Sequence, residues 1–158
     1  MSVPFLTLVQ LCNLSSAPAT AALGDLYFKN SAGVVQVCTN ATGPVFTDLN
    51  SYDISCSVSG KPTASQKVLI FPTVRPFTVS ATGHKSKVYV NPTATASFLC
   101  QKNGTTFGTL TISTAGVLTL TSFTATAFAI GDYLTIIAPS SVDSTMADIG
   151  LTLLARAS

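Results

Sequence analysis

The sequence contains no glutamate and no tryptophan, and charged residues make up only 9% of its 158 residues. A typical soluble domain carries about 25% charged residues. Because surface helices are built largely from Glu, Lys, Arg and Gln, this composition argues against any long amphipathic helix. Threonine and serine are abundant instead, so we expect an all-β protein.

The low charge also bears on the surface of the molecule. A lone soluble domain normally covers itself with mixed charges. A large interface between copies of the chain would explain so few charges, and a wet surface rich in Thr and Ser is the alternative; we favour the interface. The net charge of +2 is too small for a nucleic-acid partner. The small basic cluster at residues 84–87 is interpreted as a solvated loop.

Residues suited to catalysis or metal binding are few. His84 is the only histidine, and the cysteines form no Cys-x-x-Cys pair, so we expect no metal site and no cofactor. A catalytic carboxylate pair or a calcium site could in principle form from Asp132, Asp143 and Asp148. These residues lack the spacing of a calcium loop, and we interpret Asp132 and Asp143 as turn residues. We therefore expect no catalytic residues and a protein that is not an enzyme. Whether the four cysteines are thiols or disulfides is left open: Cys12, Cys38, Cys56 and Cys100.

The first residues are apolar but make a poor export signal. They include no basic segment, Pro4 interrupts them, and no apolar run approaches the ~18 residues that a membrane span needs. No membrane partner is therefore expected. Residues 3–11 are predicted to form a strand or an extended arm, which packs either on its own domain or on a neighbouring subunit. Residues 13–20 are predicted to be a linker.

The rest of the chain alternates short β-favouring runs with turn pairs. The run at Leu26–Lys29, a tight turn and the run at 34–39 predict a β-hairpin. Between residues 53 and 155 such runs recur about every 8–12 residues, which predicts eight or nine strands in an antiparallel β-sandwich of jelly-roll-like form. Asn103-Gly104 is the clearest turn, because a type I′ turn needs positive φ at both central residues.

Apolar residues at every second position predict which strand faces pack on the core. The clearest examples are Phe98 with Cys100, Leu110 with Ile112, Leu134 with Ile136, and Ile149 with Leu151 and Leu153. We divide the chain into an N-terminal arm and β-hairpin attachment module (residues 1–50) and a β-sandwich domain (residues 51–158).

Residues 13–37, NLSSAPATAALGDLYFKNSAGVVQV, contain Ala-Pro, then Gly-Asp-Leu-Tyr-Phe, a turn and a valine-rich strand. This run resembles the short adaptor modules of bacteriophage fibre proteins, over about a sixth of the chain. Many such modules continue with Gly-x-x-Trp. This chain departs from that pattern, because it has Thr42-Gly43-Pro44-Val45-Phe46 and no tryptophan.

A second resemblance covers residues 60–155. Its main elements are Asn103-Gly104-Thr105, Gly131-Asp132 and the segment DSTMADIGLTL at residues 143–153. These are similar to a module found in many virion proteins of tailed phages. The resemblance implies a structural component of the particle, such as a head fibre, a head decoration or a tail accessory protein. Such components are often trimeric, and the resemblance implies no catalytic residues.

Together these observations predict a non-enzymatic structural protein of a phage virion, of the head-fibre or capsid-decoration type. It is expected to assemble with itself, as a homotrimer, in the host cytoplasm and to dock on the major capsid protein or other virion proteins. The apolar residues Phe5, Leu6 and Leu8 are the predicted docking residues. Head, neck and tail locations are all left open.

The alternative is a carbohydrate- or receptor-binding jelly-roll module of a tail or neck fibre, an analogy at the level of the fold. Sugar sites usually present exposed aromatic rings, and this chain has no tryptophan and only four tyrosines. Tyr52, Tyr89 and Tyr133 are the candidate ligand-facing residues.

Overall fold

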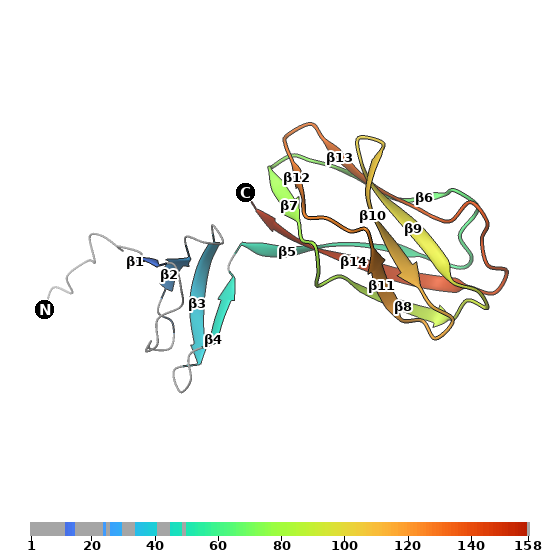
Figure 1. Cartoon of the computed structure of the whole chain (residues 1–158), viewed down its shortest axis with the longest axis horizontal. Coiled ribbons are helices and arrows are strands. Elements are labelled where there is room, and N and C mark those ends of the chain that lie inside the picture. Colours follow the sequence, from blue (N-terminus) through green and yellow to red (C-terminus); the bar gives the residue numbers. More distant parts are fainter. Residues whose placement is uncertain are drawn as a thin grey trace, which may run out of the picture. The chain divides into compact units, whose positions relative to one another are not determined.

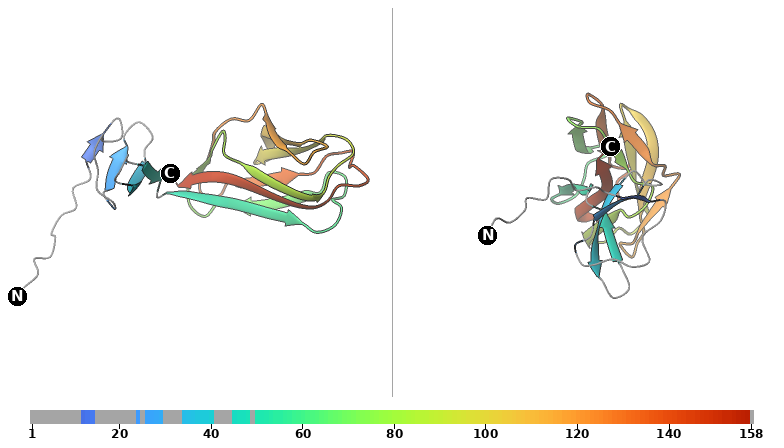
Figure 2. Two further views of the ribbon diagram at one scale, coloured as in Figure 1. Left: turned by 90° about the horizontal axis from the view of Figure 1, so that it is seen from below. Right: turned by 90° about the vertical axis from the view of Figure 1, so that its left-hand side faces the viewer.

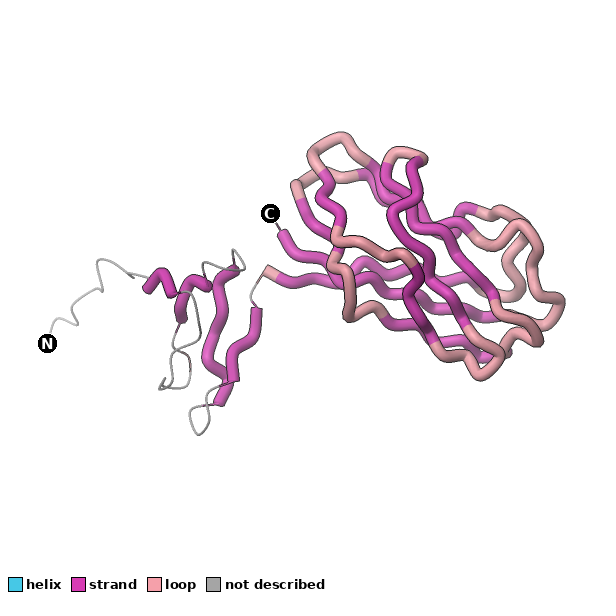
Figure 3. Tube along the Cα trace, viewed as in Figure 1, coloured by secondary structure: helices cyan, strands magenta, loops and turns pink. Residues whose placement is uncertain are grey.

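The computed structural model describes residues 12–14, 24, 26–29, 34–40, 45–48 and 50–157. These residues form fourteen strands (Figure 3). They include no helix of the length and apolarity that crossing a membrane requires. The prediction of an all-β protein is confirmed. The chain divides into two compact units, Met1–Asn50 and Ser51–Ser158, which are described separately.

The N-terminal unit contains a four-stranded sheet with the order β1-β2-β3-β4. Its strands are β1 (Cys12–Leu14), β2 (Leu26–Lys29), β3 (Val34–Asn40) and β4 (Val45–Asp48). Strands β2 and β3 form the predicted hairpin, and β4 pairs antiparallel with β3. The predicted linker is wrong at its start, because Asn13 and Leu14 pair parallel with Phe28 and Lys29 of β2. Backbone hydrogen bonding to the open edge of β2 outweighs the weak strand propensity of Asn.

The C-terminal unit is an antiparallel β-sandwich of two sheets (Figure 1). The first sheet has the order β11-β10-β9-β13-β6. Its strands are β6 (Lys67–Pro72), β9 (Ala96–Lys102), β10 (Thr105–Ile112), β11 (Leu118–Thr121) and β13 (Tyr133–Ile137). The sandwich is therefore confirmed, whereas the jelly-roll form stays a prediction.

The second sheet is organised around its longest strand, β14 (Ala147–Ala157), which runs through the sandwich in Figure 2. One edge of β14 pairs with β5 (Ser51–Val58); the other pairs first with β8 (Lys85–Val90) and then with β7 (Phe77–Val79). Strand β12 (Thr126–Phe128) adds to β7. The unit thus has ten strands, more than the eight or nine predicted, because the three-residue strand β12 is too short to show a clear alternation.

The core lies between the two sheets and follows the predicted alternation. Each of the predicted inward-facing residues of β9, β10, β13 and β14 is at most 2% exposed. Aromatic rings fill one part of this core, where Phe77 and Phe128 stack with centroids 4.7 Å apart and Phe107 meets Phe128 edge-on. The β9–β10 turn also has the predicted geometry, with φ of 50° at Asn103 and 86° at Gly104.

Candidate functional site

The Asp143 carboxylate ties together two loops of the sandwich. Its Oδ1 accepts hydrogen bonds from the Thr145 hydroxyl (2.6 Å), the Thr145 amide and the Met146 amide in its own loop between β13 and β14. Its Oδ2 accepts from the Thr93 hydroxyl (2.7 Å), the Thr93 amide and the Ala94 amide in the loop between β8 and β9. These bonds, led by the hydroxyls of Thr145 and Thr93, hold the pKa of Asp143 far below its usual range. The carboxylate therefore organises loops, as predicted.

Asp132 has a similar role beside the β9–β10 turn. Its Oδ1 accepts from the Asn103 side-chain amide at 2.6 Å, and its Oδ2 accepts from the Ala129 amide and pairs with Lys102 Nζ at 2.9 Å. The hydrogen bonds from Asn103 and Lys102 lower the pKa of Asp132 to about 2. In return, Asn103 Oδ1 accepts from the Tyr133 amide. The predicted turn role of Asp132 is also confirmed.

His84 is a buried structural residue and Lys85–Lys87 belong to strand β8, so the interpretation of residues 84–87 as a solvated loop is wrong. The ring nitrogen Nδ1 accepts from the Leu154 amide at 3.0 Å, which leaves Nε2–H to donate to the Ser80 carbonyl at 2.9 Å. The ring also packs against Phe123. Burial lowers the pKa of His84, partly offset by the Ser80 bond. Both ring nitrogens thus hydrogen-bond to backbone groups, and the ring faces protein neighbours and not solvent.

Cys100 is buried and Cys56 is half-buried, which makes both thiols of the sandwich poor nucleophiles. Burial raises the pKa of Cys56 to about 11, and burial together with the neighbouring Cys56 raises the pKa of Cys100 to about 12. Both are free thiols. Among the described residues, no group of three or more acidic, cysteine or histidine side chains is placed to hold a metal ion.

The structure separates the predicted ligand-facing tyrosines. Tyr89 lies on the outer face of the second sheet and is 78% exposed, whereas Tyr52 packs edge-on against Phe77 of the core. Tyr133 lies on the outer face of the first sheet. The three rings therefore do not form one platform. The predicted docking residues Phe5, Leu6 and Leu8 lie outside the described residues.

The outer face of the first sheet carries almost no charge. Strand register places polar and apolar side chains in rows across it, and we call this surface the threonine face. It comprises Ile70, Pro72, Ser97, Leu99, Gln101, Thr106, Thr109, Thr111, Thr119, Thr121, Tyr133, Thr135 and Ile137. Lys67, paired with Ile137 on the edge strand β6, is the one charged residue in these rows. Ile70 is 58% exposed and Leu99 is 38% exposed, so apolar surface remains open here.

The outer face of the second sheet is charged and has a groove of about 350 Å³, which we call the Tyr89 groove. It runs over β14, from β8 on one side to β5 on the other. The residues that matter for its chemistry are Ser57, Ser59, Lys87, Tyr89, Asp148 and Gly150. Of these only Tyr89 was predicted to face a ligand. The one sequence signal that could have located the groove is Gly150, a glycine isolated inside an alternating strand.

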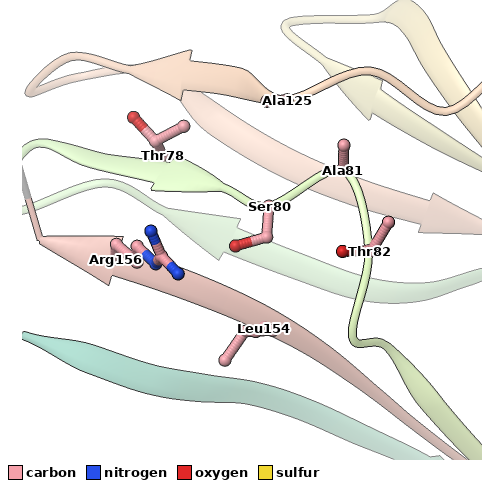
Figure 4. A pocket seen from close by; sticks show the side chains of 7 residues that line it. All are labelled: Thr78, Ser80, Ala81, Thr82, Ala125, Leu154 and Arg156. Atoms are coloured by element: carbon pink, nitrogen blue, oxygen red, sulfur yellow. The ribbon is translucent and has the colours of Figure 1, made fainter. Parts of the chain in front are cut away.

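A second hollow of about 300 Å³ lies farther along the same face, beside the C-terminal end of β14. In Figure 4, Arg156 of β14 projects toward the side of the hollow formed by Thr78 and Ser80, and Thr82 lies farther along the loop that begins at Ser80. Leu154 contributes an apolar wall. The hydroxyl groups and the guanidinium give this hollow a polar lining.

Comparison of the chain with protein-family models, with curated proteins and with solved structures gives no match.

Proposed function

We propose that the chain is a non-enzymatic structural component of a phage virion, of the head-fibre or capsid-decoration type, which assembles with copies of itself through the threonine face. The observation that carries this proposal is the near absence of charge from that face. The resemblances at residues 13–37 and 60–155 and the β-sandwich fold support the same class of protein.

Burying the threonine face against another copy has a low desolvation penalty. Charged groups cost far more to remove from water than threonine hydroxyls, which can hydrogen-bond across an interface, and threonine methyl groups and apolar side chains favour burial. Depletion of charge is also the compositional mark of the buried centre of an interface. The outer face of the second sheet provides the contrast within the same unit, since it carries Asp53, Lys85, Lys87, Asp148 and Arg156.

The absolute mass in solution, measured by light scattering, tests self-assembly. We expect a trimer, with three times the 16.3 kDa of one chain. Thr109→Lys and Leu99→Lys place a charge in the middle of the threonine face and should release monomers. Thr82→Lys, on the exposed loop between β7 and β8, is the matched control and should leave the mass unchanged. A wild-type monomer at micromolar concentration would contradict the proposal.

Docking on the particle is tested separately. The apolar arm with Phe5, Leu6 and Leu8 is proposed to attach the assembly to the major capsid protein or another virion protein. Removing residues 2–12 should abolish cosedimentation with particles that lack this protein, while the circular dichroism of the sandwich stays unchanged. Full retention of cosedimentation would exclude the arm as the docking element.

A further inference from the structure

Gly150 lies in the middle of β14 and forms the floor of the Tyr89 groove. It pairs with Lys87 of β8 on one side and with Ser57 of β5 on the other. A glycine at such a position weakens a strand, because it loses more conformational entropy on folding and packs no side chain.

Nothing inside the described chain requires a glycine at position 150. Its φ is not in the left-handed region, and an added Cβ would meet only the Lys87 carbonyl oxygen, at an ordinary contact distance of 3.8 Å. Gly108 is the opposite case, because a Cβ there would overlap the Phe123 ring. A glycine inside a strand often marks a bulge, a bend, or a place where a ligand or another backbone approaches closely. Because Gly150 has no side chain, the floor of the groove stays open.

Tyr89 provides an aromatic wall beside that floor. The neighbouring outward residue of β8, Lys87, places its Nζ 5.8 Å from the centroid of the Tyr89 ring. This cation–π contact helps to orient a ring that is otherwise 78% exposed. A large aromatic side chain held on a sheet surface, where it packs on no core residue, is suited to stacking against a ligand.

Polar groups converge on the same space from both sides. Asp148 Oδ1 accepts a 2.7 Å hydrogen bond from the Gly60 amide, which fixes the carboxylate. Its other oxygen is left to accept from a ligand. Ser57 and Ser59 add hydroxyl groups from β5 and its following loop, and Lys87 adds an ammonium group. The groove thus combines donors and acceptors with one aromatic ring, and a volume near the lower end of the ~300–1,000 Å³ usual for ligand sites.

We propose that the Tyr89 groove binds a pyranose ring of a neutral saccharide. The apolar face of the sugar stacks on Tyr89, and its edge lies over the bare backbone of Gly150. Its hydroxyl groups donate to Asp148 and accept from Lys87. A side chain at position 150 would fill this space. The groove lies on the sheet opposite the threonine face, so the proposal does not depend on self-assembly.

Binding is tested on an array of neutral hexose and N-acetylhexosamine oligosaccharides, followed by titration calorimetry with the strongest ligand. Tyr89→Ala should weaken binding at least tenfold, and Tyr89→Phe should restore it to within about threefold, because stacking needs the ring and not the hydroxyl. Gly150→Val should abolish binding by filling the floor. Ile130→Ala, which removes a 71% exposed apolar side chain from the loop between β12 and β13, should bind as the wild type does.

Two results would overturn the proposal. One is an array on which no neutral oligosaccharide binds. The other is saccharide binding that persists in both Tyr89→Ala and Gly150→Val, since the sugar would then lie elsewhere. Both positions lie on the surface, and the Cβ that Gly150→Val adds makes only an ordinary contact with the Lys87 carbonyl oxygen. Thermal midpoints no lower than that of the wild type would establish that the variants are folded. Neither result bears on the mass of the assembly, so this test and that of the threonine face remain distinct.

Discussion

The Thr93 hydroxyl donates a 2.7 Å hydrogen bond to the Asp143 carboxylate, which lies fifty residues later in the sequence. This contact joins the loop that leaves β8 to the loop that enters β14. Six hydrogen bonds end on the same carboxylate, and two of the donors belong to threonine side chains. The contact is therefore a long-range constraint on the sandwich, made by loop residues and not by the core.

Replacing Asp143 should destabilise the sandwich although the residue is not fully buried. In Asp143→Asn the amide group faces backbone and hydroxyl donors that need an acceptor, so several of the six bonds are lost. We expect a clearly lower midpoint of urea unfolding. Asp53→Asn, at an exposed position of β5, is the control and should have a midpoint close to that of the wild type. Equal midpoints for the two variants would contradict this role of Asp143.

Stability should fall as the pH drops below about 6.5. Burial lowers the pKa of His84 in the folded protein from its ordinary value of 6.5. The unfolded chain therefore binds more protons than the folded chain in this range, and the free energy of unfolding decreases with decreasing pH. His84→Gln should remove this part of the pH dependence in urea titrations between pH 7 and pH 5. Protonation of Asp132 and Asp143 should lower the free energy of unfolding only below about pH 3.8, the ordinary pKa of an aspartate.

Two strand glycines should respond oppositely to alanine. In Gly108→Ala the new Cβ would overlap the Phe123 ring and approach its backbone, so we expect a loss of about 1–3 kcal/mol in the free energy of unfolding. In Gly150→Ala the new Cβ makes only an ordinary contact with the Lys87 carbonyl oxygen, so the substitution should raise that free energy by about 0.5–1 kcal/mol. Denaturant titration of both variants measures the difference. A destabilising Gly150→Ala would show that the fold itself needs this glycine.

Adjacent leucines of β14 should differ in their contribution to stability. Leu153 is fully buried between the sheets, whereas Leu154 points to the outer face. Leu153→Ala leaves a cavity and should lower the free energy of unfolding by about 2–5 kcal/mol. Leu154→Ala should lower it by about 1 kcal/mol or less. Similar losses for the two variants would mean that the alternation of faces along β14 does not govern stability.

The thiols of Cys56 and Cys100 should resist alkylation in the folded protein. Their pKa values, raised to about 11 and about 12 from the ordinary 9.0, reduce the thiolate fraction at pH 8. A shift of two units lowers that fraction about 100-fold. Iodoacetamide labelling, followed by mass spectrometry of each cysteine peptide, should therefore be at least that much slower in buffer than in urea. Labelling at equal rates would mean that these thiols are open to solvent.

The sequence predicted the structure wherever a backbone conformation favours a particular residue type. Asn103 and Gly104 accept positive φ, so their turn could be predicted, and alternation predicted the inward faces of β9, β10, β13 and β14. It was uninformative where the fold depends on tertiary hydrogen bonds. The burial of His84 follows from the distant Leu154 amide, and strand β1 follows from pairing with β2.

The candidate site was only partly predictable for the same reason. Exposed aromatics can be proposed from composition, and Tyr89 was among them. Which tyrosine stands beside an open floor depends on strand register, because Gly150 and Lys87 meet only through the pairing of β14 with β8. The location of the threonine face likewise depends on how the strands pair. Low charge predicted an interface, and the order of five strands decides where the uncharged residues gather.

The position of β14 in the sequence also governs how the sandwich is made. Strands β5, β7 and β8 all precede it, and each pairs with it; Ser51 of β5, for example, pairs with Arg156. While the nascent chain is on the ribosome, these strands have no central partner until β14 emerges. Such non-local pairing gives a high contact order, and folding that depends on it is slow. The alternating apolar faces of the earlier strands are meanwhile exposed to other nascent chains, and the interval before β14 arrives is when aggregation competes with folding.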